Sequence, residues 1–217
     1  MTSFDNIYSL FFSQIDDYEL GAMTESDALE FLYNQLLIST VEFKKCKKDL
    51  TKLTPFSLGK LAINFNGNTE VSIIEDLAFI HKNLNFTITN VDTVLKENSD
   101  YSIRIENNSN MITDIIITKL NKELPDILQV NWYFSGEFEE TLDIEEQYIL
   151  ALGMLNSWLN HKIFRERNLR QTIGDIDYKG YSSANLLAKL TLLQAQTIQQ
   201  LKIKKVNYSY NNFNGLD

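Results

Sequence analysis

Few residues in this sequence have the type and spacing that enzyme chemistry requires. The single cysteine, Cys46, lies between Lys44-Lys45 and Lys47-Lys48. Neighbouring cations favour the thiolate and could make this residue a nucleophile. The predicted C-terminus of a helix at the same place opposes an anion, because its dipole is negative there. We therefore expect Cys46 to be a small half-buried residue.

The remaining reactive residue types are sparse as well. The two histidines, His81 and His161, cannot build a His-rich zinc site by themselves. Pairs of adjacent acids occur, but neighbours on a helix point in different directions, whereas a glycosidase needs two carboxylates that face each other. The sequence also lacks the glycine-rich loops that bind phosphates. We therefore predict no enzyme activity, no cofactor and no bound metal.

The composition is that of a globular protein. The 217 residues are 44% hydrophobic and 23% charged, which is enough apolar material for a core and unlike a disordered chain. No apolar run approaches the roughly 20 residues that span a bilayer, so we expect no membrane partner. Residues 1–17 carry no Lys or Arg and do not resemble a signal peptide. We expect the chain to act inside a cell or in a particle assembled there.

Charge is distributed unevenly along the chain. The first 43 residues hold eight acids and no base, whereas residues 141–217 hold nine bases against seven acids, in a chain of net charge -9. Opposite charges at the two ends suit head-to-tail self-association, because one subunit's field complements that of the next. Solvated helix faces are the simpler explanation of the same pattern.

Basic residues gather near the C-terminal third, as Lys162, Arg165, Arg167 and Arg170. Such a cluster could contact phosphates. However, the whole chain is acidic, and aromatic residues do not alternate with the basic ones as they do in a nucleic-acid-stacking groove. Protein–protein salt bridges and simple solvation remain the alternatives for this cluster.

Helical periodicity is clear in the first fifty residues. A stripe at helical spacing predicts a first helix over 4–17 and comprises Ile7, Leu10, Phe11 and Ile15. Thr24, followed three residues later by Asp27, resembles a capping box that starts a second helix. The second helix should reach about Asp49, with an apolar face formed by Leu29, Leu32, Leu36, Thr40 and Phe43.

Helical periodicity returns after residue 142. Asp143 and Glu146 form a second capping-box pattern, and the helix that follows has a face of Tyr148, Leu152, Leu155, Leu159 and Ile163 beside Trp158. Ser182 or Ser183 is predicted to cap a last helix. Its inward residues should be Leu186, Leu187, Leu190, Leu193 and Leu201. The tail at 206–210 alternates, and could add a strand to a neighbour or remain loose.

The intervening stretch alternates like β-structure. Residues 61–65 and 70–74, joined by Asn66-Gly67, predict a hairpin with a type I′ turn. Further strands are expected at 86–89, 101–105, 113–118 and 128–134, with a short helix at 75–83. The last of these strands carries Trp132, Tyr133 and Phe134, of which at least one should enter the core, because successive side chains point to opposite faces.

We therefore predict an α+β fold in which a helical bundle is interrupted by a β-rich module. About four helices from residues 1–52 and 141–205 should form the bundle, with the module at 53–140 and a C-terminal tail at 206–217. Because insertions are tolerated where the ends of a loop already meet, the chain near Leu50 should lie close to Leu142.

Four segments, taken in order, carry a resemblance to a known family. They are IYSLFFSQIDDY (7–18), FKKCKKDL (43–50), LDIEEQYILALGMLNSWL (142–159) and YSSANLLAKL (181–190). Their order resembles the head-tail connector (adaptor) proteins of tailed phages that infect low-GC Gram-positive hosts. The similarity covers roughly residues 1–50 and 141–205.

This resemblance implies a virion structural protein at the neck, assembled in the host cytoplasm. Such a protein forms a ring, expected to be twelve-fold, beneath the portal protein, and docks a stopper or tail-completion protein. Double-stranded DNA would pass through the channel without specific binding, because a lining that held phosphates would stall it. The β-rich module would lie outside the ring.

Interface residues follow from exposed charge and from the tail. The candidate subunit or partner contacts are Lys44, Lys45, Lys47, Lys48, Arg165, Arg167, Arg170, Tyr208 and Tyr210. Two alternatives remain open. The chain could be a stopper or tail-completion protein of the neck, or a non-enzymatic binding protein whose β-rich module recognises a surface glycan or a protein.

Overall fold

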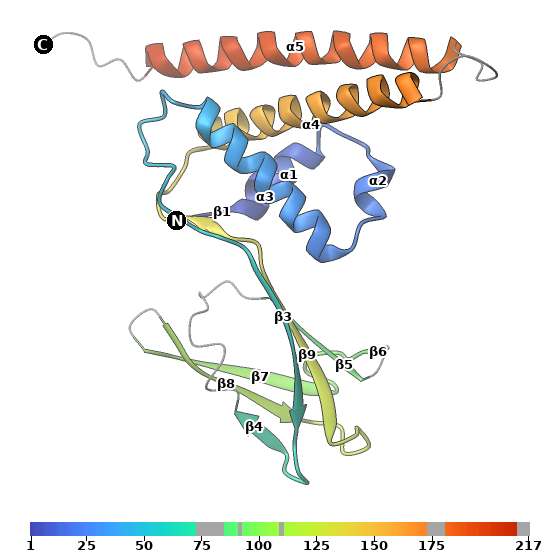
Figure 1. Ribbon diagram of the computed structural model, residues 1–217. Helices are drawn as coiled ribbons and strands as arrows, with labels where there is room; N and C mark the ends of the chain where they lie inside the picture. The colour runs from blue at the N-terminus through green and yellow to red at the C-terminus, as the bar shows by residue number, and fades with distance from the viewer. Residues whose placement is uncertain (73–84, 91–92, 109–110, 173–180, 212–217) are drawn as a thin grey trace, which may run out of the picture. The chain divides into compact units, whose positions relative to one another are not determined.

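The computed structural model describes residues 1–72, 85–90, 93–108, 111–172 and 181–211 (Figure 1). It is a mixed α+β structure with antiparallel sheets. The chain divides into two compact units, one formed by Met1–Pro55 with Ser135–Asp217 and the other by Phe56–Phe134. We call them the helical unit and the β unit, and describe each by itself.

The helical unit takes its elements from both ends of the chain. Its N-terminal elements are β1 (Thr2–Ser3), α1 (Phe4–Phe12), α2 (Tyr18–Gly21), α3 (Glu25–Glu42) and β2 (Leu53–Thr54). Its C-terminal elements are β10 (Glu137–Phe138), α4 (Ile144–Thr172) and α5 (Tyr181–Asn211). Helices α1, α3 and α5 all pack against α4, which lies at the centre of the unit.

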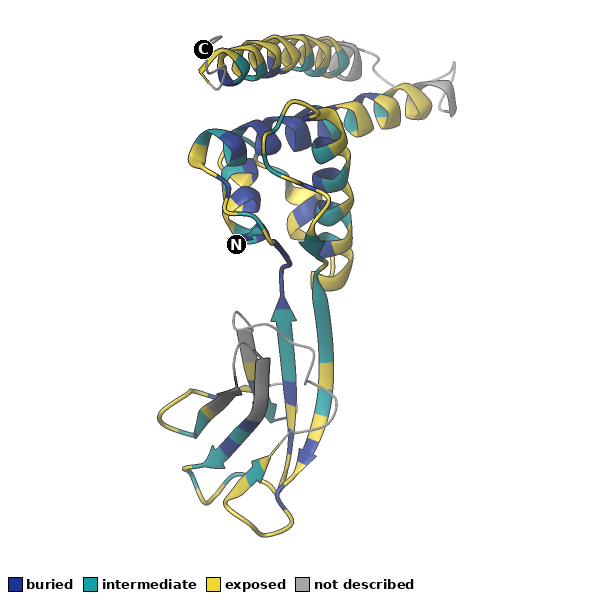
Figure 2. Cartoon of the chain, turned by 90° about the vertical axis from the view of Figure 1, so that its left-hand side faces the viewer, coloured by how far each residue is buried: buried dark blue, intermediate teal, exposed yellow. Residues whose placement is uncertain are grey.

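The sequence of α4 explains its central position. In the first half of α4, buried residues occupy adjacent positions on every side of the helix, from Ile149 through Leu152 and again at Met154, and Figure 2 shows dark blue in this part. A helix that is apolar all round must be covered on all sides. Gly153 permits the closest approach, because a Cβ there would lie 2.9 Å from Ser39 Cβ on α3.

The predicted capping box at Asp143 is confirmed, and at Thr24 the N-cap half of the predicted box is present. Thr24 Oγ1 accepts a hydrogen bond of 3.2 Å from the Asp27 backbone N–H at the start of α3. At the start of α4, the Asp143 N–H donates to Glu146 Oε2 at 2.9 Å, and the Glu146 N–H donates to Asp143 Oδ1 at 2.8 Å. Each box satisfies backbone donors that a helix N-terminus otherwise leaves without partners.

A small antiparallel sheet closes the helical unit where the chain leaves for the β unit. Its strand order is β1–β10–β2, with Thr54 opposite Glu137 and Leu53 opposite Phe138. The Glu139 N–H also donates to the Lys52 carbonyl at 3.0 Å. The expected approach of the chain near Leu50 to the chain near Leu142 is therefore confirmed, and the two ends of the insert meet.

The end of α3 differs from the prediction. The helix stops at Glu42, not near Asp49, because Phe43 leaves helical geometry with φ -92° and ψ 49°. The Phe43 side chain is buried and meets the Tyr208 ring edge-on, with 5.1 Å between ring centroids. Tertiary packing of one aromatic residue therefore ends the helix, and the lysines that follow lie on a loop.

The prediction of a strand or a loose segment at 206–210 is also wrong. Helix α5 continues to Asn211, through the segment that was expected to form a strand or remain loose. Thr197, Leu201 and Tyr208 are buried at helical spacing and face the helical unit, so the packing favours a helix over local alternation. The expected caps, Ser182 and Ser183, lie inside α5, which begins at Tyr181.

The β unit consists of two sheets. One has the order β3–β9–β5–β6, with β3 at Ser57–Asn64, β9 at Ile127–Phe134, β5 at Asn85–Asn90 and β6 at Thr93–Val94. The other has the order β4–β8–β7, with β4 at Glu70–Ser72, β8 at Met111–Lys119 and β7 at Tyr101–Asn108. Every pairing within the two sheets is antiparallel.

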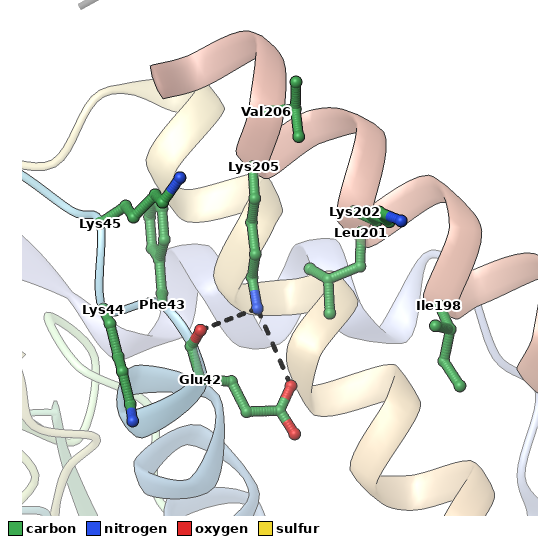
Figure 3. Close-up of a pocket in the computed structure, with 9 residues that line it drawn as sticks. All are labelled: Glu42, Phe43, Lys44, Lys45, Ile198, Leu201, Lys202, Lys205 and Val206. Atoms are coloured by element: carbon green, nitrogen blue, oxygen red, sulfur yellow. Dashed lines mark hydrogen bonds and ion pairs between the residues drawn. The ribbon is translucent and has the colours of Figure 1, made fainter. Parts of the chain in front are cut away.

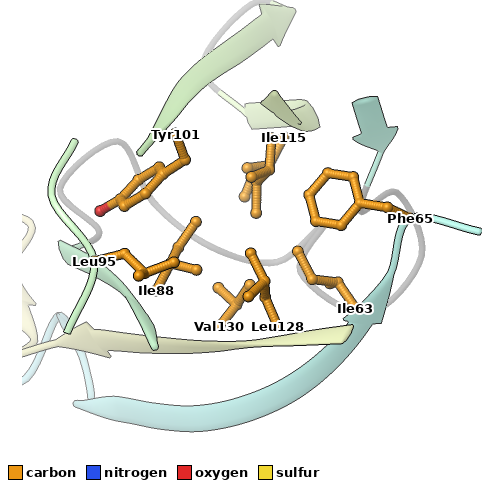
Figure 4. Close-up of a cluster of buried hydrophobic side chains, with 9 residues drawn as sticks. Ile63, Phe65, Ile88, Leu95, Tyr101, Ile115, Leu128 and Val130 are labelled. Atoms are coloured by element: carbon orange, nitrogen blue, oxygen red, sulfur yellow. The ribbon is translucent and has the colours of Figure 1, made fainter. Parts of the chain in front are cut away.

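One hydrophobic core joins these two sheets. Figure 4 shows Ile63, Val130 and Ile88 from the first sheet converging on Ile115 and Tyr101 from the second. Phe134 is also buried, which confirms that at least one of the three consecutive aromatics enters a core. Trp132 packs partly buried against the cluster and covers Gly59, where any side chain would overlap its ring.

The predicted hairpin around Asn66-Gly67 is wrong in its pairing but right in its turn. Asn66 and Gly67 have positive φ values of 50° and 80°, and the Asn68 N–H donates to the Phe65 carbonyl at 2.8 Å. The flanking strands nevertheless join different sheets, since β3 pairs with β9 and β4 pairs with β8. The turn therefore carries the chain from one sheet to the other. The short helix expected at 75–83 lies outside the described residues.

Candidate functional site

A buried polar cluster fixes the C-terminal part of α5. The Tyr208 hydroxyl donates to Glu146 Oε1 at 2.6 Å and accepts from the Lys47 backbone N–H at 3.2 Å. Cys46 Sγ lies 3.7 Å from the same Glu146 oxygen. Tyr208 and Glu146 are each only 1% exposed. The loop after α3, the start of α4 and the end of α5 thus meet at one pair of side chains.

The titration behaviour of this cluster follows from its burial. Burial raises the pKa of the Tyr208 hydroxyl well above its ordinary value, and the hydrogen bond that it donates to Glu146 adds to the effect. Burial likewise raises the pKa of the Cys46 thiol. A protonated thiol is a poor nucleophile, and the contacts of the cluster are those of a structural anchor.

A pocket opens beside this anchor, between the end of α3 and the outer turns of α5 (Figure 3). Its cavity volume is about 390 Å³. The lining is Glu42, Phe43, Lys44, Lys45, Ile198, Leu201, Lys202, Lys205 and Val206. Apolar side chains form its floor and lysines surround them, so we call it the lysine-rimmed pocket. Such a surface suits an apolar group that carries negative charge beside it.

One lysine of the rim has a structural contact. Lys205 Nζ donates to the Glu42 carbonyl at 2.9 Å and lies 4.0 Å from the Glu42 carboxylate (Figure 3). Burial lowers the pKa of Lys205, and the Glu42 carboxylate partly offsets that effect. This lysine therefore joins α5 to the C-terminus of α3. Lys44, Lys45 and Lys202 are exposed and leave the pocket positively charged.

The outer face of α5 is the second unusual surface. Four exposed apolar residues recur at helical spacing on the side away from α4, namely Leu192, Ile203, Val206 and Tyr210. Leu192 is 61% and Tyr210 is 76% exposed. Figure 2 shows most of this helix in the colour of exposed residues. We call these four residues the α5 outer stripe. It meets the lysine-rimmed pocket at Val206.

Two residues predicted to face inward belong to the exposed surface. Leu186 and Leu193 are both more than 40% exposed, whereas Leu187 and Leu190 are half-buried and Leu201 is buried. A helix with leucines on several sides offers no single apolar direction to sequence reasoning. The leucines that are buried are those that pack against α4, and this packing is not encoded in the local pattern.

The structure separates the predicted interface residues into several places. Lys44, Lys45 and Lys47 are exposed on the loop after α3, and Lys48 beside them is half-buried. Arg167 is exposed on α4, and the side chain of Arg170 lies outside the described residues. Tyr210 is exposed in the α5 outer stripe. Of this set, Lys44 and Lys45 are brought together with α5 at the pocket.

Tyr208 requires a correction. We expected it to be an interface residue of a loose tail, but it is a buried residue of the helical unit that holds Glu146 and the loop after α3. Residues 206–211 belong to α5, and Tyr208 lies on the inner face of this helix while Tyr210 lies on its outer face. We therefore remove Tyr208 from the proposed interface.

Part of the basic cluster on α4 is used inside the chain. Lys162 Nζ lies 2.9 Å from Asp17 and 2.6 Å from Glu19, and Arg165 lies 2.6 Å from the same Glu19 carboxylate. Trp158 Nε1 donates to Asp17 Oδ2 at 2.9 Å. Burial acts to raise the pKa of Asp17, but the hydrogen bonds from Lys162 and Trp158 outweigh it and lower the pKa. The cluster joins the N-terminus of α2 to α4.

Sequence reasoning missed the α5 side of the pocket, which comprises Ile198, Lys202, Lys205 and Val206. The outer stripe was missed with it. A usable signal was present, because Leu192, Ile203, Val206 and Tyr210 share one helical face opposite Leu201. Reading residues 206–210 as a strand divided that face between two predicted elements.

No protein-family description, no curated protein and no solved structure matches the chain. Among the residues that the structure describes, no group of three or more His, Cys, Asp or Glu side chains could hold a metal ion. Within the same part of the chain, none of the helices combines the length and apolarity needed to cross a membrane.

Proposed function

We propose that this protein is a virion structural protein, a head-tail connector (adaptor) that forms a ring beneath the portal protein of a tailed phage. The helical unit is the ring body. The ring extends the DNA exit channel and docks the next neck component, a stopper or tail-completion protein. It acts without cofactor or catalysis.

The α5 outer stripe is the observation that carries this proposal. Exposed apolar surface that recurs along one face of a 31-residue helix costs free energy in water unless a partner covers it. A protein whose role is assembly has such a partner. The stripe therefore favours a structural role in a larger assembly.

The distribution of the four family-like segments supports the same proposal. Residues 7–18, 43–50, 142–159 and 181–190 all belong to the helical unit, although the β unit separates them in the sequence. The resemblance thus falls on one compact body. The β unit then supplies an additional contact to a neck or tail component.

The glycan-binding alternative receives less support. An aromatic platform for a sugar needs an exposed ring face, but Trp132 is partly buried over Gly59 and Phe134 is buried. Two of the three aromatic residues of β9 are therefore poorly placed to offer a ring face to a sugar.

Co-expression with the portal protein encoded in the same genome tests this proposal. We expect the two proteins to co-purify, and we expect the double substitution Leu192→Glu with Ile203→Glu to reduce the yield of the complex at least tenfold. A matched control changes two exposed apolar residues of the β unit, Val94→Glu and Ile127→Glu, and should leave the complex intact.

A stopper or tail-completion role would give a different result. The chain would then fail to bind portal alone but would bind a preformed portal–connector assembly. Absence of portal from both preparations, together with binding to host cell wall, would contradict the connector proposal and favour a surface-binding protein.

A further inference from the structure

We propose that the lysine-rimmed pocket receives the acidic N-terminal corner of α3 from a second copy of the chain. We define the acidic corner as Met23, Glu25, Asp27 and Glu30. In this contact the Met23 side chain enters the apolar floor, and the neighbouring carboxylates meet Lys44, Lys45 and Lys202. The inference deepens the proposed function, since it assigns the contact by which neighbouring subunits join.

The pocket has the chemistry that such an occupant needs. Its floor of Ile198, Leu201 and Val206 offers apolar surface, and its exposed lysines offer positive charge. Lys205 and the Phe43–Tyr208 ring contact hold its two walls together, so the pocket is formed before binding. A preformed pocket lowers the entropy cost of association.

The acidic corner has the complementary features. Glu25, Asp27 and Glu30 are all exposed around the first turns of α3. Met23 precedes them and is 41% exposed. Methionine is flexible and polarisable, which suits it to filling an apolar depression of irregular shape. The corner therefore offers an apolar group with carboxylates beside it, which matches the pocket in both respects.

The two surfaces lie at opposite ends of one helix. Helix α3 has 18 residues, which at 1.5 Å per residue separates its ends by about 27 Å. The acidic corner is at its N-terminal end, and Glu42 to Lys45 line the pocket at its C-terminal end. One copy cannot fill its own pocket across that distance. A pocket at one end and its ligand at the other make a heterologous contact, which builds rings or filaments.

A second copy is favoured over an unrelated acidic partner. Both surfaces come from the same compact helical unit, and the first 43 residues carry eight acids and no base. Opposite charges on one subunit steer copies into head-to-tail register. No additional molecule is needed to explain either surface.

Sedimentation velocity on the full chain, from micromolar to millimolar concentration, measures this contact without portal. We expect self-association that weakens as NaCl rises, because exposed charge pairs are screened. Lys44→Glu with Lys45→Glu should weaken it at least tenfold, and so should Glu25→Lys with Glu30→Lys. Met23→Asp should weaken it without a change of lysine charge.

Mixing the two double variants gives the most specific result. Each variant retains one intact surface and carries one reversed surface. Between the two variants both the intact pair and the reversed pair are complementary, so the mixture should recover an association in which the variants alternate and which neither shows alone. The quadruple variant, with all four charges reversed, should recover self-association because its surfaces are again complementary. Lys60→Glu with Lys122→Glu, at exposed positions of the β unit, is the matched control and should have no effect.

A chain that remains monomeric up to millimolar concentration would overturn the inference. So would double variants that associate like the wild type, or a mixture that forms no heterodimer. The proposed function fails separately, by loss of portal binding while this self-association persists.

Discussion

Tyr208→Phe tests whether the end of α5 is anchored inside the helical unit. The substitution removes one hydroxyl and keeps the ring, so the edge contact with Phe43 remains. The hydrogen bonds lost include the 2.6 Å bond donated to Glu146 and the 3.2 Å bond accepted from the Lys47 N–H. Glu146 stays buried with one partner fewer.

The expected cost follows from the chemistry of these bonds. A hydrogen bond to a charged group contributes about 1.5–3 kcal/mol, and the short distance marks this one as charge-assisted. The Lys47 N–H lies on an exposed loop and can donate to water instead, so the loss of its hydrogen bond to Tyr208 adds little to the cost. We expect the free energy of unfolding of the helical unit to fall by about 2–3 kcal/mol.

Urea unfolding followed by far-UV circular dichroism at 222 nm measures this change, because the helices dominate that signal. Tyr210→Phe is the matched control, two residues later on the exposed face, and should shift stability by less than about 0.5 kcal/mol. A second readout uses pH. The raised pKa of Tyr208 means that its contribution is present below about pH 10 and is lost as pH rises through the folded-state value.

Equal stability of the two variants would refute this reasoning. It would mean that Tyr208 does not hold α5 against α4 in solution. Tyr208 would then be available to a partner, as we first expected from the sequence. A flat alkaline profile that is the same in wild type and Tyr208→Phe would lead to the same conclusion.

Three further predictions concern the helical unit. Gly153→Ala should lower the free energy of unfolding by about 2 kcal/mol in urea, although Ala is the better helix former. The new methyl group would overlap Ser39, whose hydroxyl is fixed by its hydrogen bond to the Leu150 carbonyl. Unchanged stability would contradict the close packing of α3 on α4. Asp17→Asn should lower the free energy of unfolding by about 1–2 kcal/mol at pH 7. It should also flatten the fall of stability in acid, because the lowered pKa of Asp17 stabilises the fold above about pH 4 and this contribution is lost as pH falls through the folded-state pKa. A fall in acid as steep as that of the wild type would contradict this prediction. Replacement of 56–134 by a short Gly/Ser linker should preserve the helical circular-dichroism signal, because β2 and β10 already pair; loss of that signal would show that the helical unit depends on the insert.

Local signals in the sequence predicted the structure well where both partners are close in the chain. The Asp143 and Glu146 capping box is complete within four residues, with both expected backbone bonds, and Thr24 caps α3 by accepting from the Asp27 N–H. The Asn66-Gly67 turn is another local feature, because its positive φ values depend on those two residues.

Distant partners decided the features that the sequence did not reveal. Phe43 ends α3 early because Tyr208, 165 positions away in the chain, packs against it. The strands on either side of Asn66-Gly67 pair with different partners, β3 with β9 and β4 with β8, and no local pattern specifies this pairing. The lysine-rimmed pocket required both the early end of α3 and the extended α5, so it could not be derived from either segment alone.

Negative-stain imaging of the chain mixed with its portal protein tests the central claim most directly. A connector should give a ring of copies stacked coaxially on the portal, with twelve-fold symmetry in end views and an open central channel. Portal particles that look the same with and without the chain would contradict it.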